Sequence, residues 1–195
     1  MTEEQRITAC KTAIGQIYTM LRSSPQQWPN FLTLARTTIV HLDSTTFMQQ
    51  TTRTTEQIWI IAALQILAFK NFDSGATMDL YSWCSRQWLV ILQRDPQNLA
   101  ALRGLGQMWL SRAQPALARI HTSQNQSSST GSGVERSGRS RVESSLEADR
   151  RVGAADYVEA RGFLQPATEY LERSAAAASA QSTLSGDLLA KVSLT

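Results

Sequence analysis

The chain has 195 residues, of which 42% are hydrophobic and 18% are charged, and this length is enough to bury a real core. Its two cysteines and two histidines exclude a disulfide framework or a cysteine-based zinc site, and they leave few candidates for histidine-centred chemistry. The net charge of +3 contains no block of five or six like charges, which argues against a nucleic-acid partner.

The N-terminus and the apolar stretches indicate an intracellular protein, cytoplasmic or nuclear. The first residues include Glu3 and Glu4 and lack the apolar segment of a secretory signal. The most apolar run, residues 58–69, is shorter than the roughly 20 residues needed to cross a bilayer. We therefore expect no transmembrane helix and no membrane partner.

Helical periodicity extends through the first part of the chain, and we predict six helices there. Thr2 can cap the first, whose apolar residues at 7, 10, 14, 17 and 21 recur at three- and four-residue steps and form its inner face. The third is apolar on nearly every side, which places it at the centre of the core. Asn98 can cap the fifth, and Pro115 suits the first turn of the sixth. The predicted helices cover about residues 3–23, 29–42, 54–72, 77–93, 98–112 and 115–121.

The composition changes sharply between residues 122 and 145, where nine residues are Ser and three are Gly. Such a segment buries too little apolar surface to offset its ordering entropy, so we predict a disordered insert. Within it, Ser137, Ser140 and Ser144 lie near arginines, a context that basophilic kinases favour. Phosphorylation there would change the charge of the insert.

Helical character resumes at residue 146 and continues to 180, with a predicted break at 161–162. A last amphipathic stretch covers 186–194. We therefore predict a helical domain over 1–121, the insert over 122–145, and a C-terminal helical hairpin with a truncated last helix over 146–195. No strand pattern is present, and the predicted fold class is all-α.

A repeat signal lies in the middle of the chain, where small residues, aromatics and a proline recur at fixed spacing. Ala118 follows Cys84 by 34 residues, which resembles the period of the tetratricopeptide repeat. The residues of the signature are Cys84, Trp88, Ile91, Pro96, Leu105, Gly106, Trp109 and Ala118.

The resemblance implies antiparallel helical hairpins, from about residue 54 onward, stacked in a right-handed superhelix. Leu105 and Gly106 would belong to the first helix of a hairpin, and Cys84 and Ala118 would take the small position of the second helix. Such superhelices hold a peptide or a partner helix on one face. The polar residues available for this role are Arg86, Asn98, Arg103 and Arg112.

These observations predict a non-enzymatic interaction or scaffold subunit with a protein partner and no cofactor. The first alternative is an irregular all-α regulatory subunit of a larger complex, for example a nuclear one. A small all-α enzyme is the third reading, but the sequence has no nucleophile elbow, dinucleotide fingerprint or phosphate loop, so no catalytic residue is assigned. Cys10 and Cys84 lie on apolar faces typical of core packing, and His41 with Asp43 is typical of a solvated pair.

Overall fold

The computed structural model describes residues 1–71, 75–129 and 155–181, and for 124–129 only the backbone. These residues form helices and no strands, which confirms the predicted all-α class. The α-helices are α1 (Glu3–Ser23), α2 (Leu32–Asp43), α3 (Thr54–Ala68), α4 (Met78–Arg94), α5 (Leu99–Ser129) and α7 (Ala155–Ala180). The 3-10 segments are η1 (Pro25–Phe31), η2 (Phe47–Gln49), η3 (Thr51–Arg53) and η4 (Phe69–Asn71).

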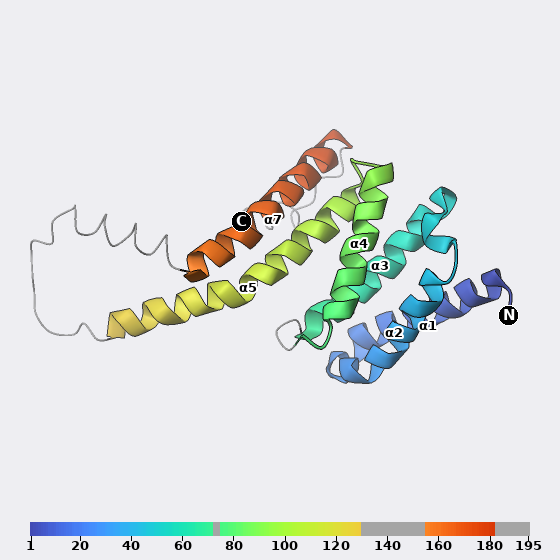
Figure 1. Cartoon of the computed structure of the whole chain (residues 1–195), viewed down its shortest axis with the longest axis horizontal. Helices are drawn as coiled ribbons and strands as arrows, with labels where there is room; N and C mark the ends of the chain where they lie inside the picture. Colours follow the sequence, from blue (N-terminus) through green and yellow to red (C-terminus); the bar gives the residue numbers. More distant parts are fainter. Residues whose placement is uncertain (72–74, 130–154, 182–195) are drawn as a thin grey trace, which may run out of the picture.

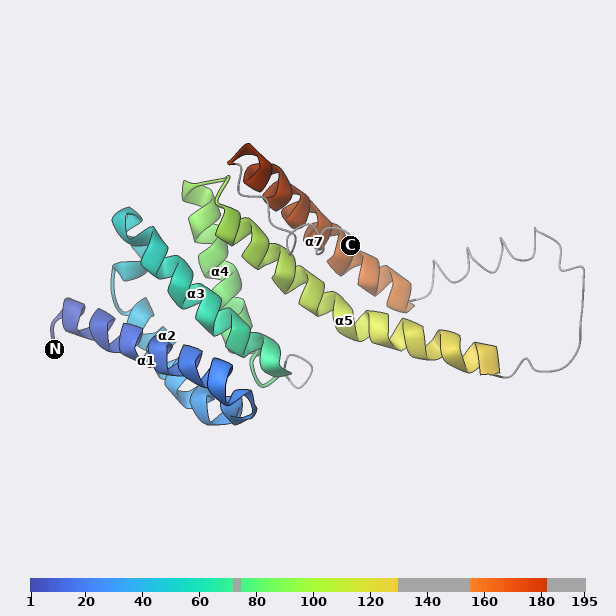
Figure 2. The same cartoon turned by 180° about the vertical axis from the view of Figure 1, so that it is seen from behind.

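The described helices form three hairpins in succession along the chain (Figure 1). α1 packs against α2, α3 against α4, and α5 against α7. α3 also contacts both α1 and α5, so α1, α3 and α5 lie side by side, as Figure 2 shows. α5 and α7 extend beyond the other helices as a long two-helix arm.

The main core lies among α1 to α4. The predicted inner face of α1 is buried, as is most of α3. Two large side chains of α3 nevertheless face outward, because Trp59 is 38% and Ile66 is 43% exposed. One face of this apolar helix is therefore uncovered. The largest fully buried side chains include Trp88, Phe47, Ile14, Leu42, Ile60, Leu64 and Leu80.

Two predicted helix caps are confirmed. The Thr2 hydroxyl accepts a hydrogen bond from the Gln5 backbone, and the Gln5 side chain accepts one from the Thr2 N–H, which forms a capping box. At α5, the side-chain oxygen of Asn98 accepts a hydrogen bond of 3.1 Å from the Ala101 backbone. Short polar side chains ahead of an apolar pattern were therefore sufficient to place these two helix starts.

The expected start of the second helix at Pro29 is wrong, since residues 25–31 form the 3-10 segment η1 and α2 begins at Leu32. Pro25 and Pro29 both lie in η1, and neither has a backbone N–H to donate, which favours short turns over a regular α-helix. The third expected helix also ends earlier than predicted, at Ala68, with η4 following.

The predicted fifth and sixth helices are one helix, α5, which continues through Pro115. Ala113 and Ala116, on either side of this proline, are fully buried where α7 packs along α5. That packing offsets the cost of the hydrogen bond that a proline removes, about 3 kcal/mol. The hairpin expected within residues 98–121 does not form.

α5 also continues through residues 122–129, which were predicted to belong to the disordered insert. The hydroxyls of Thr122 and Ser123 donate hydrogen bonds to the backbone carbonyls of Ala118 and Arg119, one helical turn earlier. The other residues of the predicted insert, including Ser137, Ser140 and Ser144, lie outside the described residues.

The predicted break at residues 161–162 is absent, because α7 is continuous through Gly162 and Pro166. α7 packs against α5 along most of its length. The two helices expected on either side of the break are therefore a single helix, and the hairpin predicted within the C-terminal region does not form. The contact with α5 outweighs the local preferences of one glycine and one proline. The stretch predicted at 186–194 lies outside the described residues.

Candidate functional site

A cleft of about 580 Å³ lies between α3 and α5, next to the uncovered face of α3. On the α3 side, its apolar side chains recur at positions 58, 62, 66 and 69, which is one stripe of a helix. We call this set of lining residues the α3/α5 cleft. They are Ile58, Ala62, Gln65, Ile66, Phe69, Trp88, Leu99, Ala100, Arg103, Gly104 and Gln107.

The floor of the α3/α5 cleft is a hydrogen-bonded set of buried groups. The indole N–H of Trp88 donates to the side-chain oxygen of Gln65, whose amide nitrogen donates to the Gly104 carbonyl at 3.1 Å. Gln65 is only 4% exposed, and both ends of its amide have a partner. This chain of bonds links α4, α3 and α5, so the floor is fixed by three helices.

Gly104 is required by this arrangement. A β-carbon at this position would lie 2.6 Å from the Trp88 ring, far inside van der Waals contact. The glycine therefore lets α5 approach the indole that forms the floor. Sequence reasoning assigned Trp88 to the repeat signature but gave no role to the glycine beside it.

The α5 wall of the cleft carries its one charged lining residue, Arg103. Its neighbours on this wall are Leu99, Ala100 and Gln107, so the wall is mixed rather than fully apolar. The α3/α5 cleft therefore combines an apolar wall with a single positive group.

The other polar residues predicted to bind a partner lie elsewhere. Arg86 lies 3.5 Å from the Asp43 carboxylate between α4 and the end of α2. Asn98 caps α5, and the Arg112 guanidinium lies over the rings of Trp109 and Phe163, 5.3 and 4.6 Å from their centroids. The structure places only Arg103 in the cleft.

The repeat-signature residues occupy unequal environments. Those on α4 and the Leu105–Gly106 pair on α5 are buried, whereas Trp109 is half-buried and Ala118 is exposed. Trp109 and Ala118 also lie on the same helix, α5. Ala118 therefore does not occupy a packing position equivalent to that of Cys84.

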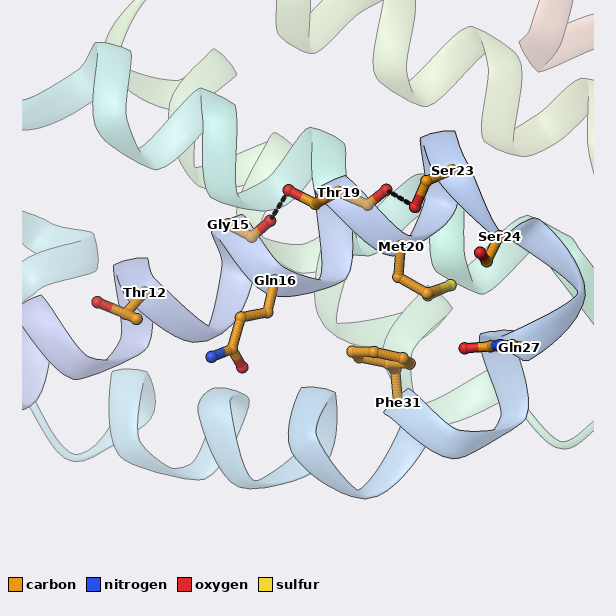
Figure 3. A pocket seen from close by; sticks show the side chains of 9 residues that line it. All are labelled: Thr12, Gly15, Gln16, Thr19, Met20, Ser23, Ser24, Gln27 and Phe31. Atoms are coloured by element: carbon orange, nitrogen blue, oxygen red, sulfur yellow. Dashed lines mark hydrogen bonds between the residues drawn. The ribbon is translucent and has the colours of Figure 1, made fainter.

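A second hollow, of about 590 Å³, lies between α1 and η1. Figure 3 shows Met20 and Phe31 facing each other across it, with Gln16 on α1 and Gln27 on η1. We call it the α1/η1 pocket. Its lining residues, none of them charged, are Thr12, Gly15, Gln16, Thr19, Met20, Ser23, Ser24, Gln27 and Phe31.

Three titratable side chains, those of Cys10, Cys84 and Tyr81, are part of the hydrophobic core. Burial raises the pKa of both the Cys10 and the Cys84 thiols, and it raises the pKa of Tyr81 to about 12. The Tyr81 hydroxyl donates to the Met108 carbonyl at 2.9 Å. These shifts disfavour the ionised, nucleophilic forms.

Among the residues that the structure describes, no group of three His, Cys, Asp or Glu side chains could hold a metal ion. The carboxylate of Asp43 accepts a hydrogen bond of 2.8 Å from the Trp83 indole, so this group ties α2 to α4. In the same parts of the chain, no helix has both the length and the apolarity to cross a membrane.

Comparison of the sequence with protein-family models gave no match, and searches of curated proteins and of solved structures found no similar protein.

Proposed function

We propose that the chain is a non-enzymatic interaction subunit that binds an amphipathic helix of a partner protein in the α3/α5 cleft. The observation that carries the proposal is the apolar stripe at positions 58, 62, 66 and 69, which lines an open cleft and is only partly buried, with Ile66 43% exposed. Exposed apolar surface of this kind is typical of interaction sites.

The shape of the cleft favours a helix as the occupant. The stripe runs from residue 58 in α3 to residue 69 at the start of η4, a rise of eleven residues or about 16 Å at 1.5 Å per residue, which matches three turns of a bound helix. Helix-in-groove recognition uses anchors at the same three- and four-residue spacing. The bound helix would lie between α3 and α5, and the fixed floor of Trp88 and Gln65 would limit its depth.

Charge indicates one further property of the partner helix. Arg103 is the one charged residue that lines the cleft, and an acidic side chain on the partner would complement it. We expect a helix with an apolar face bordered by Asp or Glu. A strongly basic helix would place like charges together.

A succession of helical hairpins is the feature that the chain shares with the tetratricopeptide architecture. The first helices of these hairpins begin at Glu3, Thr54 and Leu99, so the hairpins are 51 and 45 residues apart. This spacing exceeds the 34 residues of that family, and the proposed function therefore rests on the cleft and not on the family.

The test compares two aliphatic side chains, Ile66 and Leu89, whose exposed fractions are nearly the same. Ile66 is 43% exposed in the cleft, and Leu89 is 42% exposed on α4 outside the lining of the cleft. A photo-crosslinking amino acid is placed at each position in turn, and the crosslinked partner segment is sequenced by mass spectrometry. We expect position 66 alone to capture a segment with apolar residues at three- and four-residue spacing and an acidic flank.

The substitution Ile66→Glu should then abolish the interaction with that segment, made as a peptide, whereas Leu89→Glu should leave it unchanged. Both side chains are partly exposed, so neither change should unfold the protein. Equal binding by the two variants, or a captured segment without helical apolar spacing, would overturn the proposal.

A further inference from the structure

Each helix of the α5–α7 arm contains a proline in its interior. Pro115 lies in α5 and Pro166 in α7, whereas the other three of the five prolines in the chain lie outside the α-helices. A proline has no N–H to donate to the carbonyl four residues earlier, and its ring crowds that carbonyl. The carbonyls of Ser111 and Gly162 therefore lack their helical partner, and each helix has one weakened turn.

The two weakened turns lie side by side. α5 and α7 are antiparallel, and three contacts set their register: Gly106 with Leu171, Arg112 with Phe163 and Arg119 with Asp156. Because both helices rise by the same 1.5 Å per residue, residues 111–115 of α5 lie beside about residues 161–165 of α7. The weakened turn of α7, residues 162–166, matches this position within about one residue.

The weakened level lies where the arm leaves the other helices. Hydrogen bonds join the Gly104 carbonyl to α3 and the Met108 carbonyl to α4, and the weakened turn of α5 follows directly after them. Figure 2 shows α5 changing direction near its middle, which is close to Pro115, and the same change is visible in Figure 1. The helix therefore bends where its backbone bond is missing.

Small side chains pack the two helices together at this level. Ala113 and Ala116 of α5 are fully buried against α7. An alanine side chain makes few van der Waals contacts, so a change in the angle of the helices breaks few of them. Farther out, Arg119 forms ion pairs with both Asp156 and Glu159, which hold the outer parts of the two helices together.

Two packed helices can bend together only if both give way at the same level. We propose that residues 111–115 and 162–166 form a hinge, about which the outer part of the arm, residues 116–129 and 155–161, swings as one unit. A hinge of this kind is a short set of positions that absorbs the change in backbone angles, while the parts on either side stay rigid. The α3/α5 cleft lies on the inner side of the hinge, so the arm changes direction without changing the cleft.

The experiment measures distances across the hinge in the full chain by pulsed electron paramagnetic resonance. The spin labels are attached through non-natural amino acids, so the two buried thiols stay as they are. The test pair combines Thr12 on α1 with Thr122, which lies beyond the hinge on α5. The control pair combines Thr12 with Glu172, which lies on α7 before the hinge. All three side chains are exposed.

We expect a wider distance distribution for the test pair than for the control pair. Thr122 lies about 14 Å beyond the centre of the hinge, so a change in bend of about 20° moves it by about 5 Å. The double variant Pro115→Ala/Pro166→Ala restores both N–H groups and favours a regular helix. The extra width of about 5 Å should disappear in this variant, and each single variant should keep part of it.

Pro29→Ala, in η1 and outside the arm, is the matched control and should change neither distribution. The proposal is overturned if the two pairs have equal widths in the unchanged chain, which would mean a fixed bend, or if the double variant keeps the extra width. The first comparison needs no proline substitution, so it decides the question even if the double variant fails to fold. Neither comparison involves binding in the α3/α5 cleft, so the outcome leaves the proposed function untouched.

Discussion

The α1–α4 region and the α5–α7 arm are packed with different kinds of side chain. The first buries large residues such as Trp88, Phe47 and Ile60. Apart from Leu171, every buried residue of α7 is alanine or serine, and Leu171 lies against Gly106 of α5. The α1–α4 region therefore depends on the volume that its side chains fill, and the arm depends on how closely two helices approach.

This difference predicts opposite sensitivities. Removing atoms leaves a cavity among large side chains, with a cost that grows with the volume lost. Between helices packed through small residues, the damaging change is an added atom. The α1–α4 region should respond most to truncation and the α5–α7 arm most to enlargement.

The largest expected effect is at Trp88. The substitution Trp88→Ala should lower the free energy of unfolding by about 3–5 kcal/mol, because the side chain is 2% exposed and its loss also leaves the Gln65 oxygen unpaired. Trp109→Ala should cost about 1 kcal/mol, since Trp109 is half-buried on the arm. Urea unfolding followed by far-UV circular dichroism measures both.

Trp88→Phe serves as the control, because it keeps most of the ring but removes the N–H group. Trp88→Phe should lower the free energy of unfolding, but by less than Trp88→Ala does. If Trp109→Ala lowers the free energy of unfolding as much as Trp88→Ala does, the dependence on large buried side chains is not confined to the α1–α4 region.

The next effect concerns the arm. In Gly106→Ala the added β-carbon would lie 2.7 Å from the Leu171 Cγ and 3.3 Å from its backbone nitrogen. We expect a loss of about 1–3 kcal/mol, despite the gain of about 1 kcal/mol in helix propensity. Hydrogen exchange should become faster in α7 and stay unchanged in α1 and α2.

A second substitution tests the cause. Leu171→Ala removes the side-chain atoms that the new β-carbon would meet, so the double variant should lose less than the sum of the two single variants. Additive losses would show that the contact between Gly106 and Leu171 does not set the distance between the helices.

The smallest effect is the response to acid of an ion pair in the α1–α4 region. The Arg36 guanidinium, 2.7 Å from Asp79, holds the pKa of this carboxyl below its usual value and ties α2 to α4. A lowered pKa in the folded state means stabilisation that is present above the ordinary aspartate pKa and lost as the pH falls through the folded value.

Both side chains are about half exposed, so the contribution should stay below about 1 kcal/mol. Unfolding measured from about pH 6 to about pH 3 should show a shallower fall for Asp79→Asn than for the unchanged chain. An identical pH dependence in both proteins would show that the pair does not stabilise the fold.

Much of the fold could be predicted where local and tertiary preferences agree. The three-and-four spacing of Ile7, Ile14 and Ile17 predicted the buried face of α1, and Thr2 predicted its start. The predictions of a new helix starting at Pro115 and of a break at residues 161–162 were wrong, because α5 and α7 continue through these positions. Contact between α5 and α7 stabilises both helices through these residues, and this contact joins segments distant in sequence.

The candidate site was harder to predict than the fold. The sequence showed α3 as apolar on nearly every side, which indicates burial, but it did not show which stripe would remain uncovered. That depends on where α1 and α5 lie against it. Arg103 and Arg112 also looked equivalent in sequence, yet Arg103 lines the cleft and Arg112 covers two aromatic rings.

The two buried cysteines have a practical consequence. The Cys10 sulfur lies 3.8 Å from the Thr38 carbonyl across the α1–α2 hairpin, and the Cys84 sulfur lies 3.7 Å from the Ile61 carbonyl across the α3–α4 hairpin. The chain has no other thiol. The rates at which a thiol-specific reagent labels Cys10 and Cys84 therefore report the opening of the first and the second hairpin, and the α5–α7 arm has no thiol. Each of the first two hairpins therefore contains one native thiol whose reactivity can be used to follow its opening.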